Sequence, residues 1–467
     1  MHIGRYCLST VSRTRHGHTT PTPKHCRSST ARTSKAMWQH IAYDWVDPLE
    51  MAAGIPASAG DFVLLHSGLE APFTGRYSLL ALYKDREVVA EDFKPLEPML
   101  TTRQPTYENA WFGYFGYGLK NVLEELPHDK AWHIALPNLH MATYKMVIRF
   151  DHRMKQIDIW AKSSAELSAL PAPKKFSGYK APKISKIDSD MTKKQYLKKV
   201  TEVQEAILRG DIYQANLTRK FTGLFEKETD AFALFTKLCA VSPAPYSAFL
   251  RLGDTAILSS SPERLLTLTA EGMAESRPIK GSAPRGHNVA EDIFNKEQLQ
   301  ASTKNRSENL MIVDLMRNDI SRGCEIGSVR VSDLYDITSY STIHHMSSAV
   351  QGKKRAEVSP LQLAKYCFPP GSMTGAPKIE AMRLCSTLEP YARGIYSGAI
   401  GYFGGDGTVD LSVVIRTLVI QGTRFEFQVG GGIVEDSTPE DEWRETMTKA
   451  RGIAGALGLS LKELEGI

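Results

Sequence analysis

Apolar residues recur at two different spacings along the chain, and these spacings separate predicted strands from predicted helices. Short apolar runs bounded by glycine and polar turns predict strands at 61–68 and 77–83, and 142–150 with 156–162 predicts a β-hairpin. The aromatic and glycine-rich stretch 111–118 predicts a tightly packed core strand. Further strands are predicted at 246–252, 256–261, 264–269, 398–403, 412–420 and 424–429.

Helical spacing is clearest after residue 190. A long helix is predicted from about 291 to 316, and a last helix runs to about 457, with Thr438 as N-cap and Pro439 at its first position. Another amphipathic helix, ended by Gly210, is predicted by the spacing of Tyr196, Val200, Val203 and Ile207. Hairpin strands mixed with separate long helices predict an α+β fold with antiparallel sheets and helices packed outside.

Composition divides the chain into four parts. Residues 163–190 are rich in Ser, Pro, Ala and Lys and are predicted to be a linker between a β-rich N-terminal subdomain, 37–162, and a larger part, 191–467. Residues 1–36 are rich in Arg, Ser, Thr and His, lack acidic residues and are predicted to be disordered. That composition is typical of an organellar transit peptide and equally of a stretch upstream of a misplaced start codon.

The overall composition is that of a soluble globular protein. The 57 Lys and Arg residues exceed the 52 Asp and Glu, but seven of the basic residues fall within 1–43, so the rest is slightly acidic, which argues against nucleic acid as the main partner. No apolar run approaches the roughly eighteen residues of a membrane-spanning helix. The six cysteines show no metal-binding spacing and are predicted to be free thiols in a reducing cytoplasm.

Candidate chemistry begins with Lys280, in a polar stretch from 277 to 286. Its prolines and glycines predict a rigid loop that presents its side chains at defined positions. Composition alone favours a surface turn with a solvated lysine. The stretch by itself therefore does not establish a reactive amine.

Acidic residues on two predicted helices suggest a metal site. Glu442 and Glu445 are three positions apart and share a helix face, and Glu308 lies on an earlier helix. Carboxylates from two helices together provide the oxygen ligands that suit Mg²⁺. Glutamates at this spacing more often form a solvated face, so spacing alone leaves the metal open.

Glycine-rich segments and one arginine predict a site for an anion. The segments 370–375 and 430–433 can turn successive backbone N–H groups toward an anion, and neither is a P-loop, so a carboxylate fits better than a nucleotide. Arg416 interrupts an apolar predicted strand, where a guanidinium needs a partner. That partner is a ligand carboxylate or an internal salt bridge.

Together these motifs resemble the chorismate-utilising enzymes, and within them the aminodeoxychorismate synthases. The resemblance is specific from Met191 to the C-terminus and looser before it, where it rests on 64–68 and 76–78. It implies two antiparallel β-sheets forming a sandwich-like core with helices outside. The motifs that carry it are Ser261-Pro-Glu263, Pro278-Ile-Lys-Gly281, Glu308 to Asp319, Pro370 to Lys378, Ile415-Arg-Thr-Leu418 and Gly430 to Val434.

The resemblance implies a role for each matching residue. Chorismate would bind with Mg²⁺ held by Glu308 and Glu445, with Glu442 nearby, and Glu263 would be the general acid. Asn305 stands where relatives often carry an acid, which puts a secondary metal contact in doubt. The substrate contacts that it implies are Ser282, His345, Tyr402, Arg416, Gly431, Gly432, Gln214 and Lys378.

Lys280 and Gln214 indicate which chorismate reaction is implied. Related anthranilate synthases carry a small residue in place of Lys280, whereas aminodeoxychorismate synthases of this type use that lysine as a nucleophile on the ring, which requires a neutral amine and a lowered pKa. Glutamine at position 214, where water-using relatives have lysine, indicates ammonia. The resemblance implies a transaminase-class synthase for 4-aminobenzoate and folate, supplied by a separate glutamine amidotransferase subunit.

Two alternatives remain, together with a question of regulation. Anthranilate synthase component I is the nearest rival, and a non-catalytic regulatory homologue is the rival of another class. Anthranilate synthases bind tryptophan as an inhibitor through a Leu-Leu-Glu-Ser stretch, and His66 replaces that glutamate here. The substitution predicts no tryptophan feedback, although a tryptophan held structurally near Ser67 stays open.

Overall fold

The computed structural model describes residues 38–71, 74–100, 104–127, 130–176, 178–341 and 343–467, and Met37–Ile467 form one compact unit. The disorder expected for 1–36 lies outside the described residues. No helix in the described ranges is both long and apolar enough to cross a membrane.

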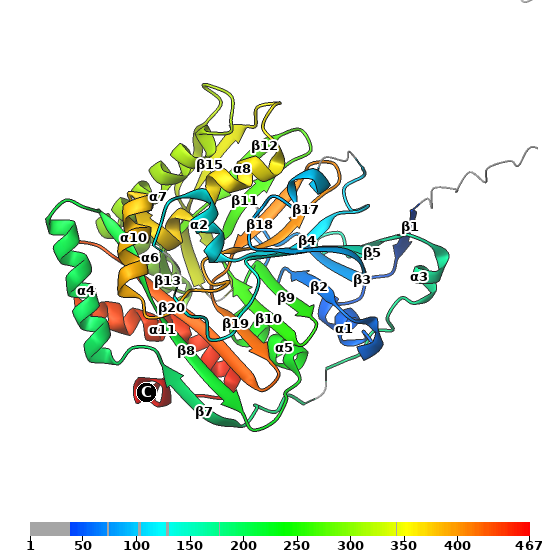
Figure 1. Ribbon diagram of the computed structural model, residues 1–467, viewed down its shortest axis with the longest axis horizontal. Helices are drawn as coiled ribbons and strands as arrows, with labels where there is room; N and C mark the ends of the chain where they lie inside the picture. Colours follow the sequence, from blue (N-terminus) through cyan, green and yellow to red (C-terminus); the bar gives the residue numbers. More distant parts are fainter. Residues whose placement is uncertain (1–37, 72–73, 101–103, 128–129, 177, 342) are drawn as a thin grey trace, which may run out of the picture. The chain divides into compact units, whose positions relative to one another are not determined.

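The strands of this unit form one hydrogen-bonded network. Among the described residues it has 20 strands, and every named strand pair is antiparallel (Figure 1). Antiparallel pairing was predicted, but a sandwich of two separate sheets is not confirmed. The strands are β1 (Gln39–Tyr43), β2 (Phe62–His66), β3 (Tyr77–Ala90), β4 (Trp111–Phe115), β5 (Leu139–Asp151), β6 (Gln156–Ala161), β7 (Ile184–Ser189), β8 (Gln214–Phe225), β9 (Tyr246–Leu252), β10 (Thr255–Ser261), β11 (Arg264–Leu268), β12 (Met273–Arg277), β13 (Ile279–Pro284), β14 (Arg330–Ser339), β15 (Ile343–Lys353), β16 (Gly375–Ala376), β17 (Ala399–Phe403), β18 (Val409–Val413), β19 (Thr417–Gln421) and β20 (Arg424–Ile433).

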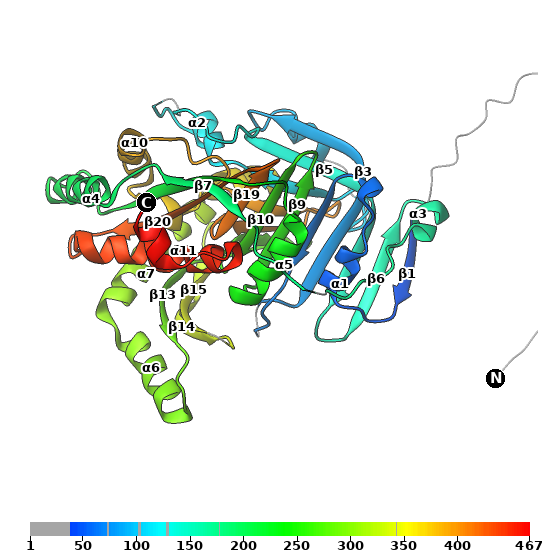
Figure 2. The ribbon, with the colours of Figure 1, turned by 90° about the horizontal axis from the view of Figure 1, so that it is seen from below.

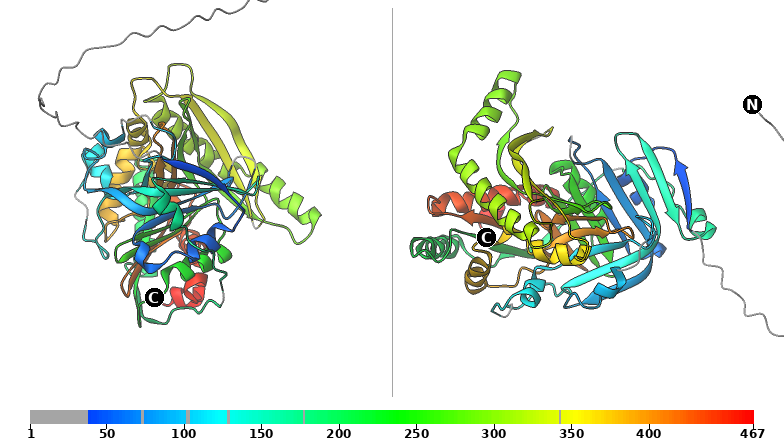
Figure 3. Two further views of the ribbon diagram at one scale, coloured as in Figure 1. Left: turned by 90° about the vertical axis from the view of Figure 1, so that its right-hand side faces the viewer. Right: turned by 90° about the horizontal axis from the view of Figure 1, so that it is seen from above.

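Helices pack against this network, and some project from it. Helices α5 and α11 lie against the strands β8, β10 and β20, and α6 projects from the rest of the unit (Figures 2 and 3). The helices are α1 (Pro48–Ala53), α2 (Lys120–Leu123), α3 (Ser164–Ser168), α4 (Lys193–Leu208), α5 (Ala231–Val241), α6 (Val289–Ala301), α7 (Thr303–Ser321), α8 (Pro360–Cys367), α9 (Gly371–Thr374), α10 (Lys378–Leu388), α11 (Pro439–Leu457) and α12 (Leu461–Glu465).

The two predicted parts of the chain share the strand network. Strand β2 pairs with β9, and β4 pairs with β17, so the strands before the predicted linker join those after it at two places. The segment 163–190 itself holds α3 and β7. Strand β7 pairs with β8 alone, and its residues are exposed or half-buried, so a polar sequence suffices for it.

Local signals located two helices well and misjudged one. Helix α4 buries Tyr196, Val200 and Val203 as its spacing predicted, and Thr438 caps α11. The single helix expected at 291–316 is wrong: α6 ends at Ala301, and Ser302 begins α7 by accepting a hydrogen bond from the Asn305 amide at 3.3 Å. A serine cap inside the helical pattern divides it into two helices.

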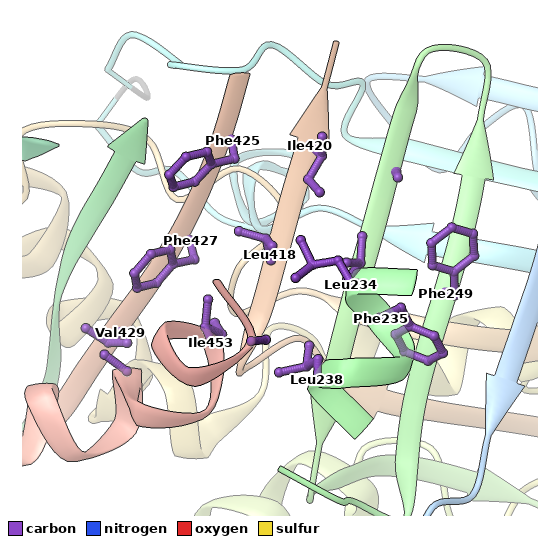
Figure 4. Close-up of a cluster of buried hydrophobic side chains, with 14 of the residues drawn as sticks. Leu234, Phe235, Leu238, Phe249, Leu418, Ile420, Phe425, Phe427, Val429 and Ile453 are labelled. Carbon is purple, nitrogen blue, oxygen red and sulfur yellow. The ribbon is translucent and has the colours of Figure 1, made fainter. Parts of the chain in front are cut away.

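Stacked aromatic side chains contribute to the core between the sheet and α5 and α11. Phe221 stacks on Phe427 at a centroid distance of 4.8 Å, and Phe225 stacks on Phe425 at 4.6 Å. Figure 4 shows Phe427 among the side chains of β19, β20, α5 and α11. This core fixes β20, whose C-terminal end carries the glycines 430–432.

Replacement of Phe427 by alanine tests the weight of this core. Phe427 is 2% exposed, so Phe427→Ala is expected to lower the free energy of unfolding by about 3–5 kcal/mol, measured by urea denaturation. Leu208→Ala is the control, because Leu208 is 73% exposed and its loss should cost within about 0.5 kcal/mol. Equal effects of the two substitutions would contradict the packing described.

Candidate active site

Lys280 lies on an irregularity in strand β13, not in a free loop. Strand β13 pairs with β15, and the register between them shifts between Ile279 and Ser282, which leaves Lys280 and Gly281 in the bulge. Gly281 has a φ of +88°, a conformation that glycine adopts without strain. Bulges redirect side chains and are frequent beside active sites. The rigid presentation of Lys280 predicted from sequence therefore comes from strand pairing.

The end of the Lys280 side chain faces strands β8 and β20. Its Nζ atom lies 3.6 Å from the position that a Cβ on Gly432 would occupy, and Gln214 Nε2 lies 2.6 Å from the same point. Both polar atoms of the Gln214 amide are buried and have no hydrogen-bond partner in the part of the chain that the structure describes. Buried amides are rarely left unpaired. Gln214 is therefore directed at a space that a polar ligand would fill.

The surroundings of Lys280 lower the pKa of its amine. Burial lowers the pKa of Lys280, and the charge of Lys449 lowers it further, while Glu308, Glu263 and Glu445 act in the opposite direction. Within the described residues, Lys280 forms no hydrogen bond or ion pair. The direction of the pKa shift is the one that nucleophilic chemistry requires.

Glu263 is the counterpart of this amine. It is 6% exposed, and its Oε1 accepts a hydrogen bond from Ser372 Oγ at 2.6 Å. Burial raises the pKa of Glu263, although Ser372 and the charges of Lys280 and Lys449 oppose the shift. A raised pKa lets a carboxylic acid keep its proton to higher pH, which is the direction that a general acid requires.

The three predicted metal ligands share this neighbourhood. Glu442 Oε2 lies 2.6 Å, and Glu445 Oε1 3.9 Å, from the position of a Cβ on Gly431, and Glu308 and Glu445 both act electrostatically on Lys280. Glu442 accepts a hydrogen bond from Ser437 through Oε1, while its buried Oε2 has no partner among the described residues.

The pKa values of two of these carboxylates are shifted in opposite directions. Burial raises the pKa of Glu442. Burial also opposes ionisation of Glu445, but Lys449, whose Nζ lies 2.6 Å from Glu445 Oε1, outweighs it and lowers the pKa of Glu445. In the described ranges, no group of three or more His, Cys, Asp or Glu side chains is arranged as a ready metal site. The orphaned Glu442 oxygen and the all-carboxylate donor set nevertheless suit a hard cation.

Arg416 provides a cationic group without a protein anion. It has a φ of +50°, which is strained for a residue with a side chain. It lies between β18 and β19, so the prediction of a single strand at 412–420 is wrong. Its guanidinium forms no salt bridge or hydrogen bond within the described residues, and burial lowers its pKa. The predicted alternative of an internal salt bridge is therefore not found there.

His345 and Ser282 lie beside Arg416 and Lys280. Ser282 Oγ and His345 Nδ1 are 2.7 Å apart across the β13–β15 pair. Burial, reinforced by the charge of Arg416, lowers the pKa of His345 to about 3. The imidazole is therefore neutral, and its ring is a polar but uncharged group beside Arg416.

Two predicted substrate contacts lie elsewhere. Lys378 Nζ lies 2.6 Å from the buried Asp319 carboxylate and donates to the Pro369 carbonyl, so its charge is already compensated. Tyr402 stacks on Phe112 with ring centroids 5.6 Å apart and lines a separate cavity of about 280 Å³. No described interaction joins either residue to Lys280.

This separate cavity contains the stretch predicted to govern tryptophan binding. His66 and Ser67 line it, and Ser67 Oγ donates to the carbonyls of Tyr77 and Pro245. Burial lowers the pKa of His66 to about 4. His66 is therefore neutral, and unlike a glutamate at this position it has no negative charge to bind the ammonium group of tryptophan. The prediction about tryptophan feedback stays a prediction.

Sequence reasoning missed two residues that hold the site together. Ser372 was visible within the glycine-rich segment at 370–375, but nothing local connected it to Glu263, 109 positions away. Lys449 follows Glu445 by one helical turn and also donates to the Gly430 carbonyl at 2.8 Å. The i, i+4 spacing was a usable signal for that ion pair.

Comparison with known proteins identifies the family of this chain. The profile of the family described as "chorismate binding enzyme" matches residues 66–455. The chain belongs to this family. It is 37% identical to aminodeoxychorismate synthase component 1 of Escherichia coli K12, over 77% of this chain and 78% of that protein. It is 34% identical to the chloroplastic aminodeoxychorismate synthase of Arabidopsis thaliana, over 90% of this chain and 48% of that protein.

The chain therefore spans about half the length of the Arabidopsis relative. Among solved structures, anthranilate synthase component I from Streptococcus pneumoniae is similar, with 26% identity, a TM-score of 0.69 and coverage of 92% of this chain and 95% of that one. The fold is thus that of the chorismate-binding enzymes, as the resemblance implied.

Replacement of Gly431 tests the close approach of Glu442 to β20. A Cβ at Gly431 would lie 2.6 Å from Glu442 Oε2, so Gly431→Ala is expected to displace that carboxylate and lower the thermal midpoint. Gly455→Ala, inside α11, is the control. A Cβ at Gly455 would meet only Val241 Cγ2 of α5, at 3.9 Å, so alanine should stabilise α11 by about 0.5–1 kcal/mol. A Gly431→Ala protein with an unchanged midpoint and an unmoved Glu442 in its crystal structure would contradict the geometry.

Proposed function

We propose that this protein aminates chorismate with ammonia to give 4-amino-4-deoxychorismate, the precursor of 4-aminobenzoate and folate. The observation that carries the proposal is that Lys280 and Glu263 share one buried neighbourhood and have pKa values shifted in opposite directions. A neutral amine and a protonated carboxyl are the two groups needed to displace a hydroxyl from a ring. The similarity to aminodeoxychorismate synthases supports the same reaction.

The reaction would proceed in two displacements. The Lys280 amine attacks carbon 2 of the chorismate ring, the two conjugated ring double bonds shift, and the 4-hydroxyl leaves as water after taking a proton from Glu263. Ammonia then adds at carbon 4, the two double bonds return, and the Lys280 amine leaves carbon 2. One proton released by the attacking nitrogens returns to Glu263 and one to the departing lysine, so the protein ends as it began.

Recognition of the substrate would use the groups that lack protein partners. The Arg416 guanidinium suits a carboxylate in a bidentate geometry, and the neutral His345 lies beside it. Gln214 offers an oxygen that can accept from ammonia and an N–H that can donate to the substrate. The glycines at 431 and 432 leave room for these contacts beside β20.

A magnesium ion would be held by Glu308 and Glu445, with Glu442 beside them. When bound, it would neutralise a substrate carboxylate and fix its orientation. The support for this assignment is the unpaired Glu442 Oε2 and the carboxylate donor set around Gly431.

Ammonia would come from a partner protein, a glutamine amidotransferase subunit. The Escherichia coli relative is a component 1, a name that implies a second component. We place the protein in the cytoplasm, a location that the four buried free thiols of the described residues suit.

Anthranilate formation is the second candidate, because a similar solved structure is an anthranilate synthase component I. It requires ammonia to add at carbon 2, the position that Lys280 would occupy in the first reaction. The presence of the lysine therefore favours addition at carbon 4.

Loss of the Lys280 amine tests the covalent step. With chorismate, Mg²⁺ and ammonium, Lys280→Ala is expected to form 4-amino-4-deoxychorismate at least about tenfold more slowly, which corresponds to about 1.4 kcal/mol of transition-state stabilisation. Lys296→Ala, at an exposed lysine on α6, is the control and should keep its rate within about twofold. A full wild-type rate for Lys280→Ala would exclude the lysine as nucleophile.

Removal of the Ser372 hydroxyl tests the role of Glu263. The hydrogen bond from Ser372 lowers the pKa of Glu263, so Ser372→Ala should raise that pKa further. Because Glu263 acts in its protonated form, the alkaline limb of the pH profile of kcat should move to higher pH. Thr374→Val is the control, since Thr374 bonds within its own loop to the Pro370 carbonyl. An alkaline limb that moves to lower pH, or not at all, would argue against Glu263 as the acid.

A further inference from the structure

Strand β8 buries a polar face beside the active site. Gln214, Asn216, Thr218 and Lys220 alternate along it and are all at most 3% exposed. Residues between them, such as Ala215 and Leu217, belong to the apolar core. Buried polar groups need hydrogen-bond partners, so this face requires an equally polar neighbour.

That neighbour is the buried ion pair between Glu389 and Arg393. Their side chains are 6% and 1% exposed, and they form a bidentate contact, Nη2 to Oε1 at 2.7 Å and Nε to Oε2 at 2.9 Å. Glu389 Oε1 also accepts from the Thr218 amide at 3.1 Å and from its hydroxyl at 2.8 Å. The pair is therefore attached to the middle of β8.

The remaining donors of Arg393 bridge two segments of the site. Nη1 donates to the Met373 carbonyl, and Nη2 donates to the Asn216 carbonyl, each at 2.7 Å. Met373 follows Ser372, which hydrogen-bonds the acid Glu263. Asn216 lies two residues from Gln214, the side chain beside Lys280. One planar guanidinium thus connects the segment of the acid with the strand beside the nucleophile.

We propose that Arg393, held by Glu389, is a positioning residue that sets Ser372, and through it Glu263, relative to Gln214 and Lys280. The inference rests on the proposed function for its kinetic readout, but the contacts that carry it are independent of the product. Lysine cannot replace arginine here, because a single ammonium lacks the planar fork that reaches two carbonyls and a carboxylate together.

A double-mutant cycle tests whether Arg393 acts through Ser372. Arg393→Lys should lower kcat about tenfold or more, with KM for chorismate within about threefold, because the acid rather than substrate binding is disturbed. Ser372→Ala introduced into Arg393→Lys should then reduce kcat by less than about twofold further. Full additivity of the two losses, or an unchanged kcat in Arg393→Lys, would overturn the proposal.

A matched buried ion pair separates positioning from stability. Lys220 and Glu426 are 3.3 Å apart on the same polar face; Lys220 also donates to the Ala392 carbonyl, and among the described residues neither side chain hydrogen-bonds the Ser372 segment. Glu426→Gln should lower the thermal midpoint as Arg393→Lys does, but keep kcat within about twofold. An equal loss of kcat in both variants would mean that general destabilisation, and not positioning, explains the effect.

A crystal structure of the variant distinguishes failure of this inference from failure of the proposed function. In Arg393→Lys, Ser372 Oγ should lie outside hydrogen-bond distance of Glu263, even if the wild-type protein makes another product or none. If Arg393→Lys does not fold, the isosteric Glu389→Gln, which weakens the hold on Arg393, takes its place in both experiments. An unmoved Ser372 in the folded variant would overturn the inference.

Discussion

The site depends on an electrostatic constraint: Lys280 is surrounded by carboxylates and pairs with none of them. Three of these carboxylates have donors of their own: Glu263 accepts from Ser372, Glu442 from Ser437 and Glu445 from Lys449. These contacts leave burial as the largest influence on the Lys280 amine and lower its pKa. If a carboxylate turned to Lys280, it would favour the charged amine over the neutral form that the proposed nucleophilic attack requires.

Backbone irregularities make that arrangement possible. A register shift between β13 and β15 places Lys280. The left-handed backbone of Arg416 interrupts the strand direction between β18 and β19. Gly431 and Gly432 let side chains approach β20. Such features are energetically unfavourable by themselves and persist where surrounding structure imposes them. Here the imposing structure is the aromatic core under β20 and the buried polar face of β8.

Elements with local signals could be predicted from the sequence, and elements fixed by distant partners could not. The periodicity of α4 and the Thr438 cap of α11 are properties of short segments, and both were located correctly. The motifs also brought Lys280, Glu263 and the three glutamates to one neighbourhood. The bulge at Lys280 depends on β15, the ion pair of Lys378 depends on Asp319, and the strand break at Arg416 depends on one backbone angle. The local spacing of apolar and polar residues therefore does not predict any of these three features.

The central claim is that this site directs ammonia to carbon 4 of chorismate. Its most direct test is mass spectrometry with chromatographic separation of the products formed from chorismate, Mg²⁺ and ¹⁵N-ammonium by the wild-type protein. The account predicts labelled 4-amino-4-deoxychorismate that keeps its enolpyruvyl group. Labelled anthranilate with release of pyruvate, or unchanged chorismate, would contradict it.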